Sequence, residues 1–433
     1  MNPVEPAGGP LDGRTILRFA HAYTSGGGVE RLLDDLDGIL LARSAATVVR
    51  LYIGQPGVDV PREISVGRGR LCLVPLFLRD GGARSLASDH EAAPGLKQRL
   101  RNAILYQPMI WRTMGRRYTL RRKLPPRSGE VKGAGECLVQ LAQQRHLDLC
   151  VLHFFGGADA EEVLLQAHRY GIPVALQNHF ANDRFDNLSI RKHALLADGV
   201  AGVSGIDVPA YVSSRFVNLS DGIDLACFDR GQASPVDAPA DTAVILMPAR
   251  IVRPKGQMDL VNAAAELQRR GLNFQIAFAG RVDSAPFEKE LRDRAAELGV
   301  TDRVRFLGQL PAANLRDWLA ASAAVAFPTY HHEGLSRILI ESQAMGVPVV
   351  AYNTGGNREA FVDGQTGFLV RTGDVDRLAD CLAKLLVDPA LRKRMAEAGP
   401  GFARQRYGLE AVAQRHEEFY LKLIARGPVA RAR

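Results

Sequence analysis

One stretch of this chain places a strand, a loop, a helix and a second strand directly after one another: VAFPTYHHEGLSRILIESQAMGVPVVAY. Residues 323–327 are apolar and closed by a proline, which predicts a buried strand, and residues 329–335 predict the loop at its carboxyl end. Residues 337–345 suit a helix that ends at a glycine, and residues 347–351 begin a new strand. Because strands and helices also alternate in residues 15–77, we expect an α/β fold with a mostly parallel sheet.

The N-terminus of the helix in this stretch predicts a site for an anion. Backbone amides of Gly334, Leu335 and Ser336 point toward such an anion, helped by the helix dipole, and Ser336 has the side chain of an N-cap. Glu341 lies in the second turn among apolar neighbours, and helical side chains lean toward the N-terminus. Its carboxylate therefore suits the hydroxyl groups of a sugar or ribose. The alternative is that Glu341 simply belongs to the polar face of the helix.

The two glutamates of this stretch carry a resemblance to a known family. Glu333 and Glu341, with GLSRILIES between and around them and AMGVPVVA and TGG after them, resemble the Glu-x7-Glu signature of retaining nucleotide-sugar glycosyltransferases, specifically glycosyltransferase family 4. The resemblance implies the GT-B architecture, in which two Rossmann-like domains face each other across a cleft and a C-terminal helix crosses back to the first domain. It also implies that Glu341 holds the nucleotide ribose and that Glu333 contacts the donor sugar.

The length of 433 residues suits two domains, because single cores of this size are uncommon. The resemblance places an acceptor-side domain in residues 1–220 plus about 409–433, and a nucleotide-sugar-binding domain in residues 243–408. The linker is expected in residues 221–242. The segment SDGIDLACF, residues 220–228, resembles the interdomain Asn-Gly-Ile-Asp turn of the family with Asp221 in place of Asn, and the Ala-, Pro- and Asp-rich residues 229–242 predict the linker.

A glycine turn is predicted near the N-terminus. The pattern of residues 15–20 predicts the first strand, and Gly26, Gly27 and Gly28 precede a helical pattern. Glycines between a strand and a helix let the backbone approach a phosphate closely, although three glycines also make an ordinary loop. In the family such a turn faces the donor diphosphate, so Gly27 and Gly28 are candidate donor-binding residues.

Two histidines lie at the ends of consecutive predicted strands. His153 ends the strand in HLDLCVLHFF, and His179 follows the strand near residues 172–176. In an open α/β sheet the ligand crevice lies outside the carboxyl ends of the strands, so either histidine can be functional, although a lone histidine is more often structural. By resemblance, His153 lies beside the donor sugar and His179 nearer the acceptor.

Two cations follow the first strand of the second half. Arg250 and Lys255 are five positions apart, and Gly256 precedes a helical pattern, so both cations can clamp a diphosphate. They match the Gly-Arg-x4-Lys-Gly pattern of the family, with Ala249 in place of its first glycine; the alternative is plain surface charge. Arg358 departs from the proline that most relatives carry at its position, and its role stays unassigned.

Residues 97–132 form a basic insertion with eleven Lys or Arg and one acid. Apolar and aromatic side chains recur at helical spacing between the cations, with Pro108 in the middle, which predicts a kinked amphipathic helix. We expect docking to a membrane surface; the alternative is a solvated insertion packed on the domain. No RNA- or DNA-binding motif accompanies the charge, so nucleic acid is not an expected partner.

No metal or other cofactor is expected. Asp35 and Asp37, and likewise Asp374 and Asp376, spell Asp-x-Asp, but the first pair falls within a predicted helix and the second at a helix start. The five cysteines include no Cys-x-x-Cys, and the N-terminus lacks a basic start followed by an apolar run. We therefore expect a cytoplasmic protein, at the cytoplasmic face of the membrane if residues 97–132 dock there.

The expected activity is transfer of a sugar from a nucleoside diphosphate to an acceptor hydroxyl with retention, in polysaccharide, lipopolysaccharide or glycolipid assembly. The net charge of +8 suits phosphate-bearing ligands, anionic lipid or nucleic acid and does not choose among them. The basic amphipathic residues 97–132 favour a lipid-linked acceptor. Glycosylation of a soluble natural product is an alternative, as is a sugar-nucleotide epimerase or phosphorylase of the same fold. A non-enzymatic basic protein that binds membrane or nucleic acid is the remaining one. The nucleotide, sugar and acceptor cannot be read from the residues.

Overall fold

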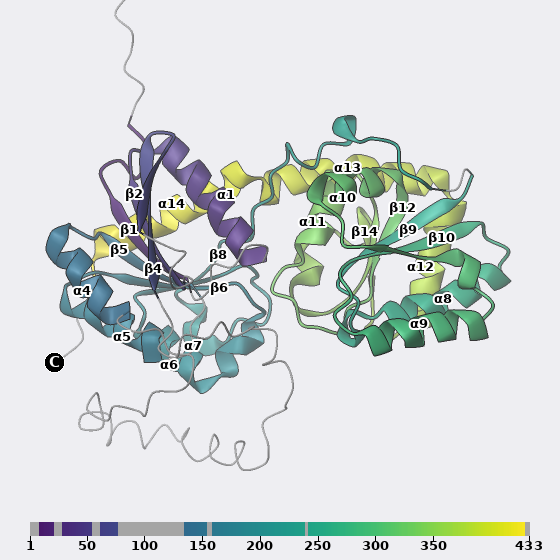
Figure 1. Ribbon diagram of the computed structural model, residues 1–433, viewed down its shortest axis with the longest axis horizontal. Coiled ribbons are helices and arrows are strands. Elements are labelled where there is room, and N and C mark those ends of the chain that lie inside the picture. Colours follow the sequence, from purple (N-terminus) through teal and green to yellow (C-terminus); the bar gives the residue numbers. More distant parts are fainter. Residues whose placement is uncertain are drawn as a thin grey trace, which may run out of the picture.

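Two parallel sheets organise the computed structural model, which describes residues 8–20, 28–53, 61–76, 134–153, 158–238 and 241–428. The first sheet has the strand order β3-β4-β2-β1-β5-β6-β7-β8, and the second has β11-β10-β9-β12-β13-β14. Within the described residues, neighbouring strands run parallel except for the pair β3–β4. Figure 1 shows the two sheets as the centres of separate domains.

All strands of the first sheet lie before residue 219 in the sequence. Its strands are β1 (Thr15–Ala20), β2 (Thr47–Ile53), β3 (Arg62–Val66), β4 (Gly69–Leu76), β5 (Leu149–His153), β6 (Val174–Asn178), β7 (Gly199–Gly202) and β8 (Phe216–Asn218). Its helices are α1 (Gly28–Arg43), α4 (Ala134–Gln144), α5 (Ala158–Arg169), α6 (Leu188–Leu196) and α7 (Ala210–Ser213), with a 3₁₀ turn η2 (Asn182–Asp186).

The second sheet begins at residue 243. Its strands are β9 (Ala243–Pro248), β10 (Phe274–Ala279), β11 (Val304–Gly308), β12 (Ser322–Phe327), β13 (Val349–Tyr352) and β14 (Gly367–Val370). Helices α8 (Gln257–Arg269), α9 (Ala285–Glu297), α10 (Ala312–Ala321), α11 (Arg337–Ala344), α12 (Val375–Val387), α13 (Pro389–Tyr407) and α14 (Leu409–Arg426) follow, with 3₁₀ turns η3 (Arg230–Gln232), η4 (Arg253–Lys255), η5 (Thr301–Arg303) and η6 (Gly355–Glu359).

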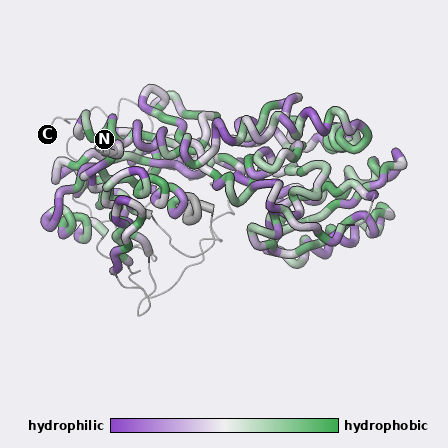
Figure 2. Tube along the Cα trace, turned by 90° about the horizontal axis from the view of Figure 1, so that it is seen from above, coloured by the Kyte–Doolittle hydropathy of each residue, from purple (hydrophilic) through white to green (hydrophobic). Residues whose placement is uncertain are grey.

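Helices cover both faces of each sheet, which explains the apolar strands. Every residue of β5 and of β6 is buried, as expected for central parallel strands. Figure 2 shows apolar and polar residues mixed along the helices, which pack on one side and meet solvent on the other. The predicted α/β class is therefore confirmed.

The last helix crosses back onto the first domain. Phe419 and Leu423 of α14 pack so closely on β7 that a Cβ at Gly199 would lie 2.9 Å from the Leu423 methyl carbons. In Figure 1 α14, in yellow, lies against the first sheet, whereas α13 runs along the second domain. This crossing was predicted from the resemblance. The strands of the two sheets fall on either side of the predicted linker 221–242, and the domain boundaries stay a prediction.

Two strands of the first sheet were missed in the sequence. β3 pairs antiparallel with β4 and is mostly exposed, and β8 is only three residues long, so neither has a buried apolar run. The insertion 97–132 and the predicted glycines Gly26 and Gly27 lie outside the described residues. Among the residues that the structure describes, no helix is long and apolar enough to cross a membrane.

Candidate functional site

The carboxyl end of β12 carries the loop and helix N-terminus that the sequence predicts as an anion site. Ser336 takes the N-cap position of α11, but its side chain makes no capping hydrogen bond. Its hydroxyl instead donates to Oδ1 of Asn357 at 2.7 Å. The predicted N-cap position of Ser336 is therefore confirmed, although its hydroxyl bonds Asn357 of the turn η6 instead of capping the helix.

Lys255 and Glu333 meet at this strand end. The Lys255 ammonium donates to Oε1 of Glu333, and their side chains are 13% and 22% exposed. Gly256 makes this approach possible, since its φ is +81° and a Cβ there would lie 1.9 Å from the Pro328 carbonyl oxygen. The structure thus joins the cation predicted for the diphosphate and the carboxylate predicted for the sugar.

Arg250 takes a different place. Its guanidinium pairs with Asp283, and its side chain is half exposed. Asp283 also accepts from Nε of Arg281 at 2.7 Å, and these arginines, Arg281 before Arg250, hold the pKa of Asp283 below its usual value. The predicted two-cation clamp is therefore not assembled in this structure, because a nearby carboxylate holds Arg250; a phosphate-binding role for Arg250 stays a prediction.

Glu341 is buried in α11 and faces an arginine that the sequence analysis did not single out. Only 6% of Glu341 is exposed, and Nε of Arg337 lies 3.9 Å from its Oε1. Nη2 of Arg337 also lies 3.6 Å from Asp35 in α1 of the first domain. The i,i+4 spacing of Arg337 and Glu341 on one helix was the signal that predicts this pair.

The histidines at the ends of β5 and β6 form a hydrogen-bonded chain. Nη1 of Arg18 lies 3.1 Å from Nε2 of His153, whose Nδ1 lies 2.8 Å from Nε2 of His179. Arginine only donates, so Nε2 of His153 accepts and its hydrogen sits on Nδ1, which donates to His179. Nε2 of His153 thus accepts from Arg18, and Nε2 of His179 accepts from His153, so the ring hydrogen of His179 sits on Nδ1.

Burial keeps these histidines neutral. It lowers the pKa of His153 well below the usual value, assisted by His179 and Arg18, and it lowers the pKa of His179 to about 3, assisted by Arg18. His416 of α14 belongs to the same region: burial lowers its pKa to about 3, and its Nε2 lies 3.0 Å from Nε2 of Gln177. The first-domain side therefore offers oriented neutral groups.

The first Asp-x-Asp pair is held by buried arginines. Asp37 is 1% exposed and pairs with Arg18 at 2.9 Å and with Arg50 at 2.5 Å. In the second pair, Asp374 is the N-cap of α12 and accepts from the amide of Arg377 at 2.9 Å. These contacts give Asp37 and Asp374 structural roles, and the structural interpretation of the two pairs stays a prediction. Among the described residues, no group of three or more acidic, histidine or cysteine side chains is arranged to hold a metal ion.

The two domains touch beside Gly334. A Cβ at Gly334 would lie 2.7 Å from the backbone carbon of Phe180 and 2.9 Å from Val203, so only glycine fits between the domains there. Phe180 directly follows His179, which brings the histidine chain next to the amides before α11. Gly28 begins α1, whereas the rest of the predicted glycine turn lies outside the described residues.

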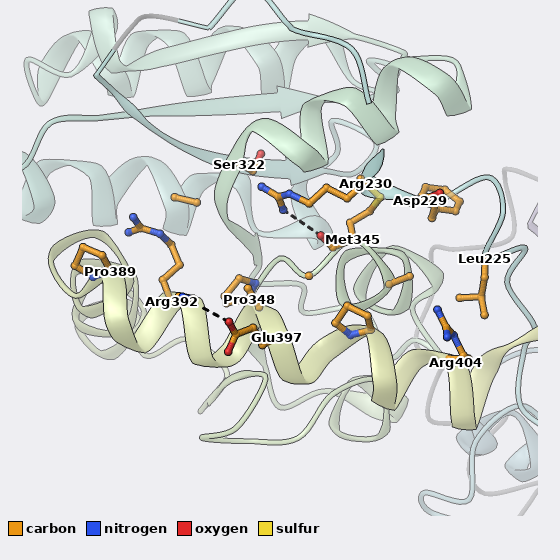
Figure 3. Close-up of a pocket in the computed structure, with 17 residues that line it drawn as sticks. Leu225, Asp229, Arg230, Ser322, Met345, Pro348, Pro389, Arg392, Glu397 and Arg404 are labelled. Carbon is orange, nitrogen blue, oxygen red and sulfur yellow. Dashed lines mark hydrogen bonds and ion pairs between the residues drawn. The ribbon is translucent and has the colours of Figure 1, made fainter. Parts of the chain in front are cut away.

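A cavity of about 680 Å³ in the described part of the chain lies elsewhere. Figure 3 shows residues from the linker, from the starts of β12 and β13 and from α13 around it, with Arg230 donating to the Met345 carbonyl at 3.1 Å. Ser322 begins β12 and Pro348 precedes β13, so this cavity lies at the amino ends of the strands. Ligands of open α/β sheets bind at the carboxyl ends, which favours the Lys255–Glu333 side.

This chain is similar to several known glycosyltransferases. Residues 232–402 match the family model described as glycosyl transferases group 1. The chain is 36% identical over 195 residues to a D-inositol 3-phosphate glycosyltransferase of Frankia alni, covering 43% of this chain and 48% of that protein. It is 33% identical over 247 residues to a GDP-mannose-dependent monoacylated alpha-(1-6)-phosphatidylinositol monomannoside mannosyltransferase of Corynebacterium glutamicum, covering 52% and 63%.

The chain thus spans about half to two thirds of the length of these curated relatives. A crystal structure of a glycosyltransferase from Rickettsia africae superposes with a TM-score of 0.66 at 18% identity, covering 95% of this chain and 98% of that one. That likeness extends over both domains and shows the fold. Residues 232–402 are thus similar to the group 1 glycosyl transferases, and the chain has the GT-B fold, as the resemblance predicted.

Proposed function

We propose that this protein transfers a sugar from a nucleoside diphosphate donor to an acceptor hydroxyl, with retention at the anomeric carbon. The observation that carries the proposal is the meeting of Lys255 and Glu333 at the N-terminus of α11, with Glu341 buried in the next turns. A cation, a row of backbone amides and two carboxylates in this order match a diphosphate, a sugar and a ribose.

In the proposed reaction the bond from the anomeric carbon to the diphosphate oxygen breaks, and negative charge grows on the leaving group. Lys255 and the amides of Gly334, Leu335 and Ser336 stabilise that charge. Arg250 joins them if it leaves Asp283. Fixed cations and dipoles then take the place of a divalent ion, so the reaction is metal-independent.

Glu333 contacts the donor sugar and stabilises its oxocarbenium-like character once the donor phosphate takes over Lys255. Glu341 accepts hydrogen bonds from the ribose, and Arg337, whose Nε lies 3.9 Å from Oε1, orients its carboxylate. The acceptor oxygen attacks on the face from which the diphosphate departs, and its proton passes to a phosphate oxygen. No side-chain base is needed in this scheme.

The first domain supplies the facing wall. His153 positions the donor sugar, His179 contacts the acceptor side, and Gly27 and Gly28 face the diphosphate. Because Arg18 and His179 occupy both ring nitrogens of His153, His153 acts in this scheme by orienting His179.

The acceptor is proposed to be lipid-linked, at the cytoplasmic face of a membrane. The supports are the basic amphipathic residues 97–132 and the phosphatidylinositol-type substrate in the name of the Corynebacterium relative. Vesicle flotation with and without anionic lipid tests this part: binding that does not depend on anionic lipid contradicts it.

The activity is tested by a thermal-shift screen of UDP-, GDP- and ADP-sugars, since a ligand at a hundred times its Kd stabilises by about 2.7 kcal/mol. The stabilising donor is then incubated with candidate acceptors, and the anomeric configuration of the product is read by NMR. Release of nucleoside diphosphate only in the presence of acceptor is expected. An inverted product contradicts retention, and donor turnover without acceptor favours an epimerase or phosphorylase.

A further inference from the structure

The 3₁₀ turn η6 reaches from the second domain to the first. Both carboxylate oxygens of Glu359 accept from the backbone amide of Gly205, each at 3.2 Å. Oε2 of Glu359 also accepts from Nδ2 of Asn218 at 3.4 Å. Gly205 follows β7 and Asn218 ends β8, so residues at the ends of two first-domain strands hydrogen-bond this carboxylate.

The other end of the same turn holds the backbone of the proposed donor site. The amide of Gly356 donates to the Glu333 carbonyl at 2.9 Å. A Cβ at Gly355, where φ is +47°, would lie 2.2 Å from that carbonyl, and one at Gly356 would lie 1.8 Å from the Gly334 carbonyl. The turn and residues 333–334 therefore cannot move independently.

The end of α13, where the chain crosses between the domains, also holds the turn η6 in place. The hydroxyl of Tyr407, at the end of α13, donates to the Glu359 carbonyl. The Tyr407 carbonyl in turn accepts from the amide of Ile223 in the linker at 2.9 Å. Glu359 thus lies where the chain passes from one domain to the other.

We infer that Glu359 is an interdomain positioning residue that aligns Glu333 and Gly334 with the donor when the first domain grips its carboxylate. The inference deepens the proposed function and rests on it for the roles of Glu333 and Gly334. In this scheme the approach of the two domains also completes the donor site. Without the hydrogen bond from the Gly205 amide, η6 is no longer held against the first domain, and the loop that carries Glu333 shifts with it. Glu359 touches no substrate in this scheme and acts through the turn.

The test compares Glu359→Ala with Arg358→Ala, a matched control because Arg358 is the exposed neighbour on the same turn. We expect Glu359→Ala to raise the radius of gyration measured by small-angle X-ray scattering. We also expect it to lower kcat about ten-fold or more, with the donor Kd changed about two-fold at most, since the donor binds second-domain residues. Arg358→Ala should match wild type in all three, and Glu359→Gln should recover part of kcat, because its carbonyl still accepts from Gly205.

Equal compactness and kcat for the two alanine variants would overturn the inference, as would a loss confined to donor affinity. If the wild-type protein transfers no sugar, the proposed function fails, and scattering still tests whether Glu359 holds the domains together. If Glu359→Ala does not fold, Gly205→Pro removes the same donor hydrogen from the first domain and must give the same expansion.

Discussion

The two sides of the proposed donor position differ in charge and exposure. We call Lys255 and Glu333 of the second domain the charged wall, and His153, His179 and His416 the neutral wall. In the second domain, Lys255 and Glu333 are charged and partly exposed, so a ligand can exchange with their mutual ion pair. In the first domain, His153 is fully buried and neutral, and Arg18 fixes its tautomer. In the proposed reaction, charge for the diphosphate therefore comes from the second domain, whereas oriented neutral groups for hydroxyls come from the first.

The largest expected effect tests the charged wall. Lys255→Met should lower kcat/KM for the nucleotide sugar by about two to three orders of magnitude, because one preorganised charge at a leaving group is worth that much. Arg253→Met is the matched control, since Arg253 lies on the same turn, is 64% exposed and pairs with Glu290. Steady-state kinetics with both variants checks this. Similar losses in the two would mean that general positive charge, rather than the Lys255 position, matters.

The next effect separates the nucleotide from the sugar. Glu341→Gln should weaken donor binding about ten-fold, since hydrogen bonds to a charged acceptor are worth about 1.5–3 kcal/mol. Free nucleoside diphosphate should lose as much affinity as the nucleotide sugar, because both contain the ribose. Isothermal titration calorimetry measures both ligands. Unaltered affinity would contradict the assignment of Glu341, and Glu290→Gln, on the exposed face of α9, supplies the control.

The sequence predicts the charged wall better than the neutral one, for a physical reason. The residues Lys255 and Glu333 follow strands with clear patterns, and each points to the same strand ends, although their direct pairing across 78 positions is invisible locally. Arg18, by contrast, interrupts the apolar strand TILRFA, and its burial makes sense only once Asp37 and His153 are beside it. Short or exposed strands such as β8 and β3 carry no buried pattern to read.

The neutral wall makes a prediction about pH. His416 is fully buried with a pKa of about 3, below the ordinary value of 6.5, so the unfolded state binds more protons between these values. Stability is therefore present above pH 6.5 and is lost on acidification, by up to about 1.4 kcal/mol per pH unit for each such histidine. Urea titrations at pH 7 and pH 5 should show a smaller fall in unfolding free energy for His416→Gln than for wild type.

His146→Gln is the control for that experiment, because the His146 side chain is 86% exposed. Asp221 acts in the opposite direction, since burial raises its pKa to about 6 and stabilises the folded state on acidification. Its contribution is common to wild type and both variants and cancels from the differences. A pH dependence of His416→Gln equal to that of wild type would mean that His416 is not held neutral in the folded protein.

The last prediction is that removal of divalent metal ions leaves turnover unchanged, which tests whether the charged wall alone supplies the charge. If Lys255 and the amides before α11 supply the charge that the leaving diphosphate needs, a chelator should leave turnover unchanged. The carboxylates of Asp37 and Asp374 are already engaged, the first by Arg18 and Arg50 and the second by the amide of Arg377. Turnover is measured after dialysis against EDTA and again after Mg²⁺ is added. A loss that Mg²⁺ restores would show that fixed charge on the second domain is insufficient and that acidic ligands outside these pairs complete the site.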